Sequence, residues 1–188
     1  MKREARLILD DGTEFCGWSF GYEGNAVGEV VFNTAMTGYP ESLTDPSYAG
    51  QILVMTYPLV GNYGVPSNLT DGRLPSLESE RIHVKALVMA DYSTEYSHWN
   101  ARESLSEWLK REKIPAITGI DTRRPTQRLR ECGVMRGKIV VSADSEYLGN
   151  TLSEYSSWTA RLVPAAQSGN SSCPMNNLLI IAVSSPLS

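Results

Sequence analysis

The hydrophobic pattern of this chain changes its period at about residue 100, and this change limits the fold more than any single motif does. Before it, β-branched and apolar residues gather in short strand-like runs, of which residues 27–34 (VGEVVFNT) and 51–56 (QILVMT) are the strongest. After it, two stretches with helical spacing alternate with further strand-like runs. This order predicts one mixed αβ domain over residues 1–142.

The chain is predicted to begin with a β-hairpin. Residues 5–9 and 13–20 flank Asp10-Asp11-Gly12, and an acidic turn that ends in glycine is typical of a hairpin between β-rich runs. Later strands are expected at residues 82–90, 114–120 and 135–141.

Two helices are expected in the second half. Asn100 and Glu103 have the spacing of a capping box, and Leu105, Trp108 and Leu109 follow on one face of a helix of about ten residues.

The second helix is expected to start at Asp121, a good N-cap residue, and to end before Gly133. Pro125 inside this helix is expected to remove a hydrogen bond and to restrict Arg124.

Composition excludes several classes of function. The 188 residues carry a formal charge of −4 with a pI near 5.3, which argues against a partner that is a nucleic acid. The longest apolar run, residues 178–183, is far shorter than a membrane span. Three widely spaced cysteines indicate reduced thiols and a cytoplasmic protein.

Neither a metal site nor a catalytic motif is predicted. His83 and His98 have no second ligand at metal-binding spacing. Cys132 has no histidine near it in sequence, so an inert thiol is the better interpretation.

The loop at residues 37–51 (TGYPESLTDPSYAGQ) joins the two strongest strands through many turn-forming residues. Asp45-Pro46-Ser47-Tyr48 has the composition of a type I turn, which places Ser47 on an exposed corner. Local chemistry leaves two alternatives open, since Ser47 either satisfies its own turn or offers a donor to a small polar ligand.

Three segments together identify a family. Residues 28–64 (GEVVFNTAMTGYPESLTDPSYAGQILVMTYPLVGNYG), residues 9–17 (LDDGTEFCG) and residues 117–139 (ITGIDTRRPTQRLRECGVMRGKI) occur in the family's order. They closely resemble the N-terminal domain of the small subunit of glutamine-dependent carbamoyl phosphate synthase, and the resemblance covers about residues 5–141.

The resemblance implies a three-layer ββα sandwich of the swivelling type, with mixed sheets and two main helices. It implies that the domain docks onto the large subunit of the synthase, which carries the ATP and magnesium sites, so this chain needs no cofactor of its own. In the family a class I glutaminase domain follows and releases ammonia from L-glutamine. A serine of the DPSY loop contacts that glutamine, and the matching position is Ser47.

Two departures from the family are visible. Pro125 stands where the family has an aliphatic residue, and residues 143–188 have the character of a linker and an atypical tail. The glutaminase domain and its Cys-His-Glu triad are therefore expected to be absent, leaving this chain inactive alone. A shifted frame or an early stop is one explanation for such a tail.

Two other functions remain open at this level. The chain is alternatively a stand-alone interaction module that kept the docking surface, or a small ligand-binding domain that uses the same loop.

Overall fold

The computed structural model describes residues 3–66, 77–97 and 101–141, which alternate short strands with three α-helices. The predicted tail at 143–188 lies outside these residues. The elements, in chain order, are β1 (Arg3–Leu9), β2 (Glu14–Ser19), β3 (Ala26–Asn33), α1 (Tyr39–Thr44), a 3₁₀ turn (Pro46–Tyr48), β4 (Gln51–Met55), β5 (Leu59–Val60), β6 (Val65–Pro66), β7 (Ala86–Val88), β8 (Asp91–Tyr92), β9 (Ala101–Glu103), α2 (Leu105–Arg111), β10 (Ala116–Thr118), α3 (Arg123–Cys132) and β11 (Met135–Val141).

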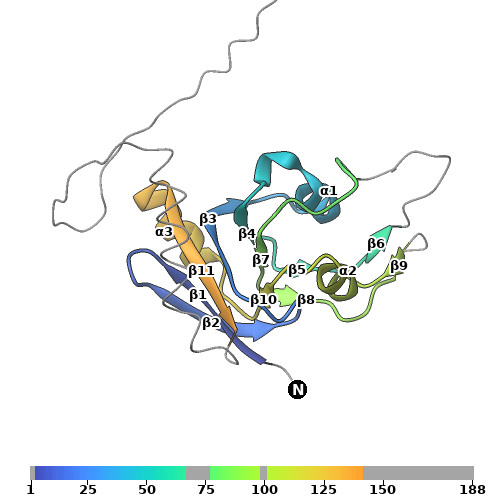
Figure 1. Cartoon of the computed structure of the whole chain (residues 1–188), viewed down its shortest axis with the longest axis horizontal. Coiled ribbons are helices and arrows are strands. Elements are labelled where there is room, and N and C mark those ends of the chain that lie inside the picture. The colour runs from blue at the N-terminus through green and yellow to red at the C-terminus, as the bar shows by residue number, and fades with distance from the viewer. Residues whose placement is uncertain (1–2, 67–76, 98–100, 142–188) are drawn as a thin grey trace, which may run out of the picture.

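Seven strands close into a barrel in the order β1-β11-β3-β4-β7-β10-β2, and β2 returns to β1 (Figure 1). Strands β3, β4, β7 and β10 run parallel, whereas β2, β1 and β11 pair antiparallel with their neighbours. The predicted hairpin is confirmed as β1 and β2. Two minor sheets, β5 with β8 and β6 with β9, lie outside the barrel.

The predicted mixed αβ class is confirmed, but the β layers of the expected ββα sandwich are not separate sheets. Both edges of the parallel half find partners in the antiparallel half, because β10 pairs with β2 and β3 pairs with β11. The two β layers are therefore opposite walls of one closed barrel. A third helix, α1, adds to the two that the sequence predicted.

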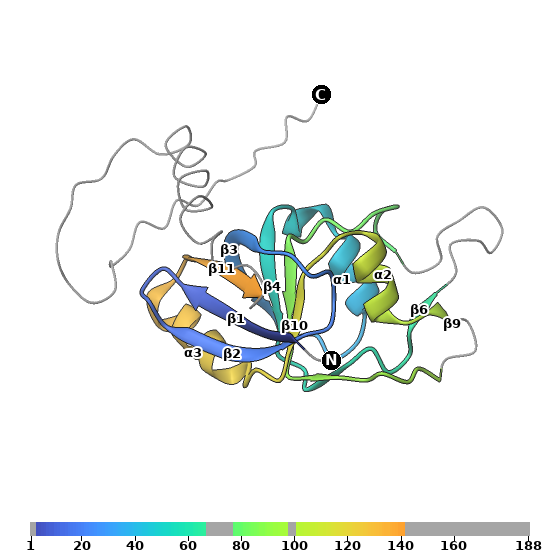
Figure 2. The same ribbon diagram turned by 60° about the horizontal axis from the view of Figure 1, so that its bottom comes forward.

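The central parallel strands, β4 and β7, are buried on both faces. In β4, Ile52 and Val54 point into the barrel, while Leu53 and Met55 belong to a second core with residues of α1 and α2. Figure 2 shows both helices beside this wall of the barrel. Leu129 of α3 belongs to the core inside the barrel. Burial on both faces explains why residues 51–56 form a continuous apolar run.

The direction of β3 and β4 explains the long loop between them. Val30 pairs with Ile52 in a parallel register, so the chain must return to the starting edge of the sheet before β4 begins. Parallel neighbours require a crossover of about a dozen residues or more, which a tight turn cannot supply. The helix α1 and the 3₁₀ turn fill this crossover.

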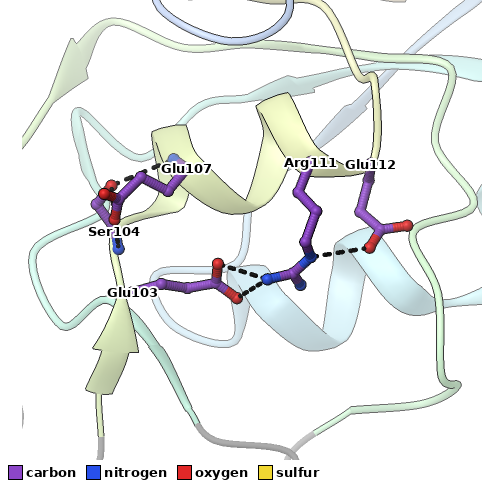
Figure 3. A network of polar contacts seen from close by, with 5 residues as sticks. All are labelled: Glu103, Ser104, Glu107, Arg111 and Glu112. Carbon is purple, nitrogen blue, oxygen red and sulfur yellow. Dashed lines mark hydrogen bonds and ion pairs between the residues drawn. The ribbon is translucent and has the colours of Figure 1, made fainter.

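The first predicted helix exists but begins later than expected. Its capping box is formed by Ser104 and Glu107: the N–H of Glu107 donates to Ser104 Oγ at 3.2 Å, and the N–H of Ser104 donates to Glu107 Oε2 at 3.0 Å (Figure 3). Glu103 ends β9 and accepts two hydrogen bonds from Arg111 instead of capping the helix. Residues 100–103 and residues 104–107 both match the capping-box pattern. Because residues 101–103 pair as strand β9, the helix begins after Ser104.

The second predicted helix is α3, and Gly133 ends it as expected, with a φ of 80°. Its N-cap is Thr122 and not the expected Asp121, although Asp121 Oδ1 accepts the N–H of Arg123 at 3.2 Å. Pro125 is the third helical residue, and the N–H groups of the first turn have no partner inside a helix. The prediction that Pro125 removes a helical hydrogen bond is therefore wrong.

Candidate functional site

The start of the loop at residues 37–51 is held by two stacked tyrosines. The rings of Tyr39 and Tyr63 lie 4.3 Å apart, and Tyr63 Oη accepts the N–H groups of Gly38 and Tyr39 at 2.9 and 3.1 Å. Tyr39 Oη donates to the carbonyl of Gly64 at 2.6 Å. Burial raises the pKa of both phenols, so both are neutral at physiological pH. Gly38 adopts a φ of 80° where the chain turns into α1.

The end of α1 is tied to the chain that follows residue 76. Thr44 is fully buried, its Oγ1 accepts the N–H of Glu78 at 3.0 Å, and its carbonyl accepts Ser79 Oγ at 2.7 Å. His83 donates its N–H to the carbonyl of Leu43 at 2.9 Å. These hydrogen bonds fix the base of the loop to the rest of the domain.

Above this base, Asp45 caps the turn that carries Ser47. Asp45 Oδ1 accepts the N–H of Ser47 at 2.8 Å, and the carbonyl of Asp45 accepts the N–H of Tyr48 at 3.1 Å. The second bond is the i to i+3 bond of the predicted turn, here part of a 3₁₀ turn. Hydrogen bonds from the backbone and side chain of Ser47 hold the pKa of Asp45 below its ordinary value.

Ser47 lies exposed on this corner, as the sequence predicted. Both its backbone N–H and its hydroxyl bond with Asp45, and the hydroxyl is the one of the two that side-chain rotation can turn toward a ligand. Whether it does so stays a prediction. Sequence reasoning missed the role of Tyr63, because its bonds to Gly38 and Tyr39 span more than twenty residues.

Among the other reactive side chains, His83 lies at the base of the loop, where its N–H donates to the carbonyl of Leu43. Cys16 is a free, exposed thiol, and Cys132 is partly buried against the core that contains Leu129. His83 Nε2 lies 2.9 Å from Ser79 Oγ. In the part of the chain that the structure describes, no group of three or more His, Cys, Asp or Glu side chains is placed to hold a metal ion.

Comparison with known proteins places this loop and barrel in a family. The family model described as the carbamoyl-phosphate synthase small chain, CPSase domain, matches residues 7–139. The chain belongs to this family. The match includes the whole crossover between β3 and β4, and therefore Ser47.

The relatives differ in length. The multifunctional protein URA2 of Saccharomyces cerevisiae is 52% identical over 161 residues, which are 83% of this chain and 7% of URA2. The carbamoyl phosphate synthase small chain of Sulfolobus acidocaldarius is 48% identical over 174 residues, 87% of this chain and 47% of that one. The arginine-specific small chain of Eremothecium gossypii is 51% identical over 142 residues, 74% of this chain and 36% of that one.

This carbamoyl-phosphate synthase small-chain domain thus spans less than a tenth of the multifunctional relatives and less than half of the small chains. Among solved structures, an aminopeptidase from Aneurinibacillus sp. strain AM-1 is similar with a TM-score of 0.38 at 12% identity, over 75% of this chain and 32% of that one. Within residues 3–66, 77–97 and 101–141, none of the helices has the length and apolar character needed to span a membrane.

Proposed function

We propose that this domain is the docking part of the small subunit of glutamine-hydrolysing carbamoyl phosphate synthase. In this role it binds the large subunit, which supplies the ATP and magnesium sites, and lends Ser47 to a neighbouring glutaminase domain. The single observation that carries the proposal is the family match over residues 7–139, which includes the DPSY turn. A cytoplasmic location is part of the proposal, although one relative is the mitochondrial carbamoyl-phosphate synthase [ammonia] of Mus musculus.

The geometry of the turn supports a role for Ser47 at a boundary between domains. The side chain is exposed, while the backbone below it is held by Asp45 and by the bonds of Thr44. A donor on an ordered corner loses little conformational freedom when a ligand binds. Glutamine brings a carboxylate and an ammonium, and a hydroxyl can replace one water that either group gives up.

We also propose that this 188-residue chain does not hydrolyse glutamine by itself. Nucleophilic release of ammonia requires a cysteine with a positioned base, as in the family's Cys-His-Glu triad. His83 is not paired with a cysteine, because its Nε2 lies 2.9 Å from Ser79 Oγ. Glutamate release that disappears on substitution of Cys16, Cys132 or Cys173 would contradict this part of the proposal.

The test joins residues 1–142 to a glutaminase domain of the family and assembles the product with a large subunit. Ser47→Ala is expected to raise the KM for glutamine about tenfold and to leave ammonia-dependent synthesis unchanged. A hydrogen bond to a charged group contributes about 1.5–3 kcal/mol, and the lower end applies because the hydroxyl also bonds with Asp45. The effect falls on KM because ground and transition states share the contact.

Ser97→Ala is the matched control, because Ser97 is also exposed and its hydroxyl has no hydrogen bond within the described ranges. Equal KM values for glutamine in the parent and Ser47→Ala enzymes would show that Ser47 only completes its own turn. Equal losses with glutamine and ammonia would show that the substitution disturbs docking of the subunits.

A further inference from the structure

A cavity of about 450 Å³ opens at the carboxyl ends of β3 and β4. It is lined by the residues that directly follow these strands and by one face of α3, namely Thr34, Thr56, Arg123, Thr126, Gln127 and Arg130. Parallel strands of αβ folds commonly bind ligands just beyond their carboxyl ends. Ser47 lies near the opposite end of β4, a strand that is about 13 Å long. The cavity is therefore separate from the candidate loop.

Helical spacing places the two arginines on the same face of α3. Arg123, Gln127 and Arg130 are at positions i, i+4 and i+7, which line one side of a helix over two turns. Both arginines therefore line the wall of the cavity that α3 forms.

Among the residues that the structure describes, these guanidinium groups have no acidic partner. Neither Arg123 nor Arg130 takes part in a side-chain hydrogen bond or ion pair within the described ranges; Arg130 lies only over the ring of Phe32, at 5.2 Å. Two acidic side chains lie close to these arginines in the sequence. Glu131 is engaged by Arg128 at 3.8 Å and by Gln127 at 3.1 Å, and Asp121 Oδ1 accepts the backbone N–H of Arg123 at 3.2 Å.

Of the three threonine hydroxyls that line the cavity, two already donate hydrogen bonds within the described part of the domain and one does not. Thr56 Oγ1 donates to the carbonyl of Asn33 at 3.1 Å, and Thr126 Oγ1 donates to the carbonyl of Thr122 at 2.7 Å. Thr34 is exposed, and its hydroxyl has no hydrogen bond in the part of the chain that the structure describes. Two guanidinium groups and one hydroxyl are thus free to donate into the cavity, and none of the described residues that line it is acidic.

We propose that this cavity binds a small oxyanion, a carboxylate or a phosphate group, between Arg123, Arg130 and Thr34. The planar fork of a guanidinium donates two parallel hydrogen bonds to either group, which is why arginine is the side chain that recognises them. The overall charge of −4 disfavours nonspecific attraction of anions, so binding depends on this local cluster.

The test titrates the full 188-residue chain with inorganic phosphate and, separately, with succinate at constant ionic strength, and follows backbone amide and arginine Nε resonances by NMR. Saturable shifts at Arg123, Arg130 and Thr34 are expected with at least one anion. Binding by phosphate alone or by succinate alone identifies which oxyanion the cavity prefers, and both results support the site. No second domain is involved, so the outcome does not depend on the proposed function.

Three substitutions of equal charge separate the site from general electrostatics. Arg123→Gln and Arg130→Gln are each expected to weaken binding about tenfold, the effect of losing one charge-assisted hydrogen bond. Arg124→Gln removes the same charge from the same helix, but Arg124 lies over the ring of Phe15 and outside the cavity lining, so a change below about twofold is expected.

Thermal unfolding of each variant checks that it is folded. Arg130→Lys, which keeps the charge but loses the planar guanidinium, replaces any variant that does not fold. Binding that Arg124→Gln weakens as much as Arg123→Gln would overturn the site. Titrations that do not saturate with either anion would overturn it as well.

Discussion

The carboxylate of Asp45 accepts the backbone N–H of Ser47 at 2.8 Å, so the residue that begins the turn holds the residue at its tip. This bond holds the backbone of the turn beneath the exposed hydroxyl. It also removes the Ser47 N–H from the donors that a ligand can use.

The first prediction concerns the pH dependence of this bond. Because the pKa of Asp45 is lowered in the fold, the carboxylate is the favoured form, and its stabilising effect is present above the ordinary value of about 3.9. The effect is lost as the pH falls through the lowered pKa of the folded state. The amide resonance of Ser47 should therefore titrate with a midpoint below about 3.9.

Asp45→Asn is the control for this titration, because asparagine keeps an acceptor oxygen and cannot titrate in this range. The low-pH transition of the Ser47 amide should be absent from this variant. A midpoint above the ordinary value in the parent chain would contradict the prediction.

The second prediction compares two tyrosines at the base of the loop. Tyr63→Phe leaves the N–H groups of Gly38 and Tyr39 without their acceptor, whereas Tyr39→Phe removes one donor from the carbonyl of Gly64. We expect a loss in the free energy of unfolding of about 2 kcal/mol for Tyr63→Phe and about 1 kcal/mol for Tyr39→Phe. Urea unfolding measures both, and the reverse order would mean that water replaces the Tyr63 hydroxyl.

The third prediction tests the observed start of α2. Ser104→Ala should destabilise the domain by about 1 kcal/mol, because it removes the acceptor of the Glu107 N–H from the helix cap. Arg111→Gln is the comparison, since it breaks an ion pair whose arginine is half-exposed and should cost less than about 0.5 kcal/mol. Chemical unfolding of the two variants gives the values, and equal losses would argue against the cap.

The fourth prediction concerns Pro125, which the sequence suggested as a destabilising residue. Since it lies in the first turn of α3, Pro125→Leu gains no intrahelical hydrogen bond, and proline also restricts the unfolded chain. The free energy of unfolding should change by less than about 1 kcal/mol. If urea unfolding shows that Pro125→Leu stabilises the domain by more than this, the proline ring strains Arg124 in the parent chain.

The sequence determined those features that depend on neighbouring residues. Asp10-Asp11-Gly12 predicted the hairpin of β1 and β2, the β-branched runs predicted β3, β4 and β11, and Gly133 predicted the end of α3. In the candidate loop, Asp45 before Pro46 predicted a capped turn with Ser47 exposed. Turn chemistry and side-chain periodicity act over a few residues, so they are readable along the chain.

Tertiary structure decided which of several locally acceptable arrangements occurs. Pairing of β10 with β2 and of β3 with β11 closed the barrel, and the parallel register of β3 and β4 required the crossover that contains α1. Residues 101–103 entered β9, which moved the start of α2 to Ser104. Folding also brought Arg123 and Arg130 to the ends of β3 and β4, nearly seventy to a hundred residues away in the sequence. Each outcome depends on hydrogen bonds and burial between distant segments, whose free energy no local pattern contains.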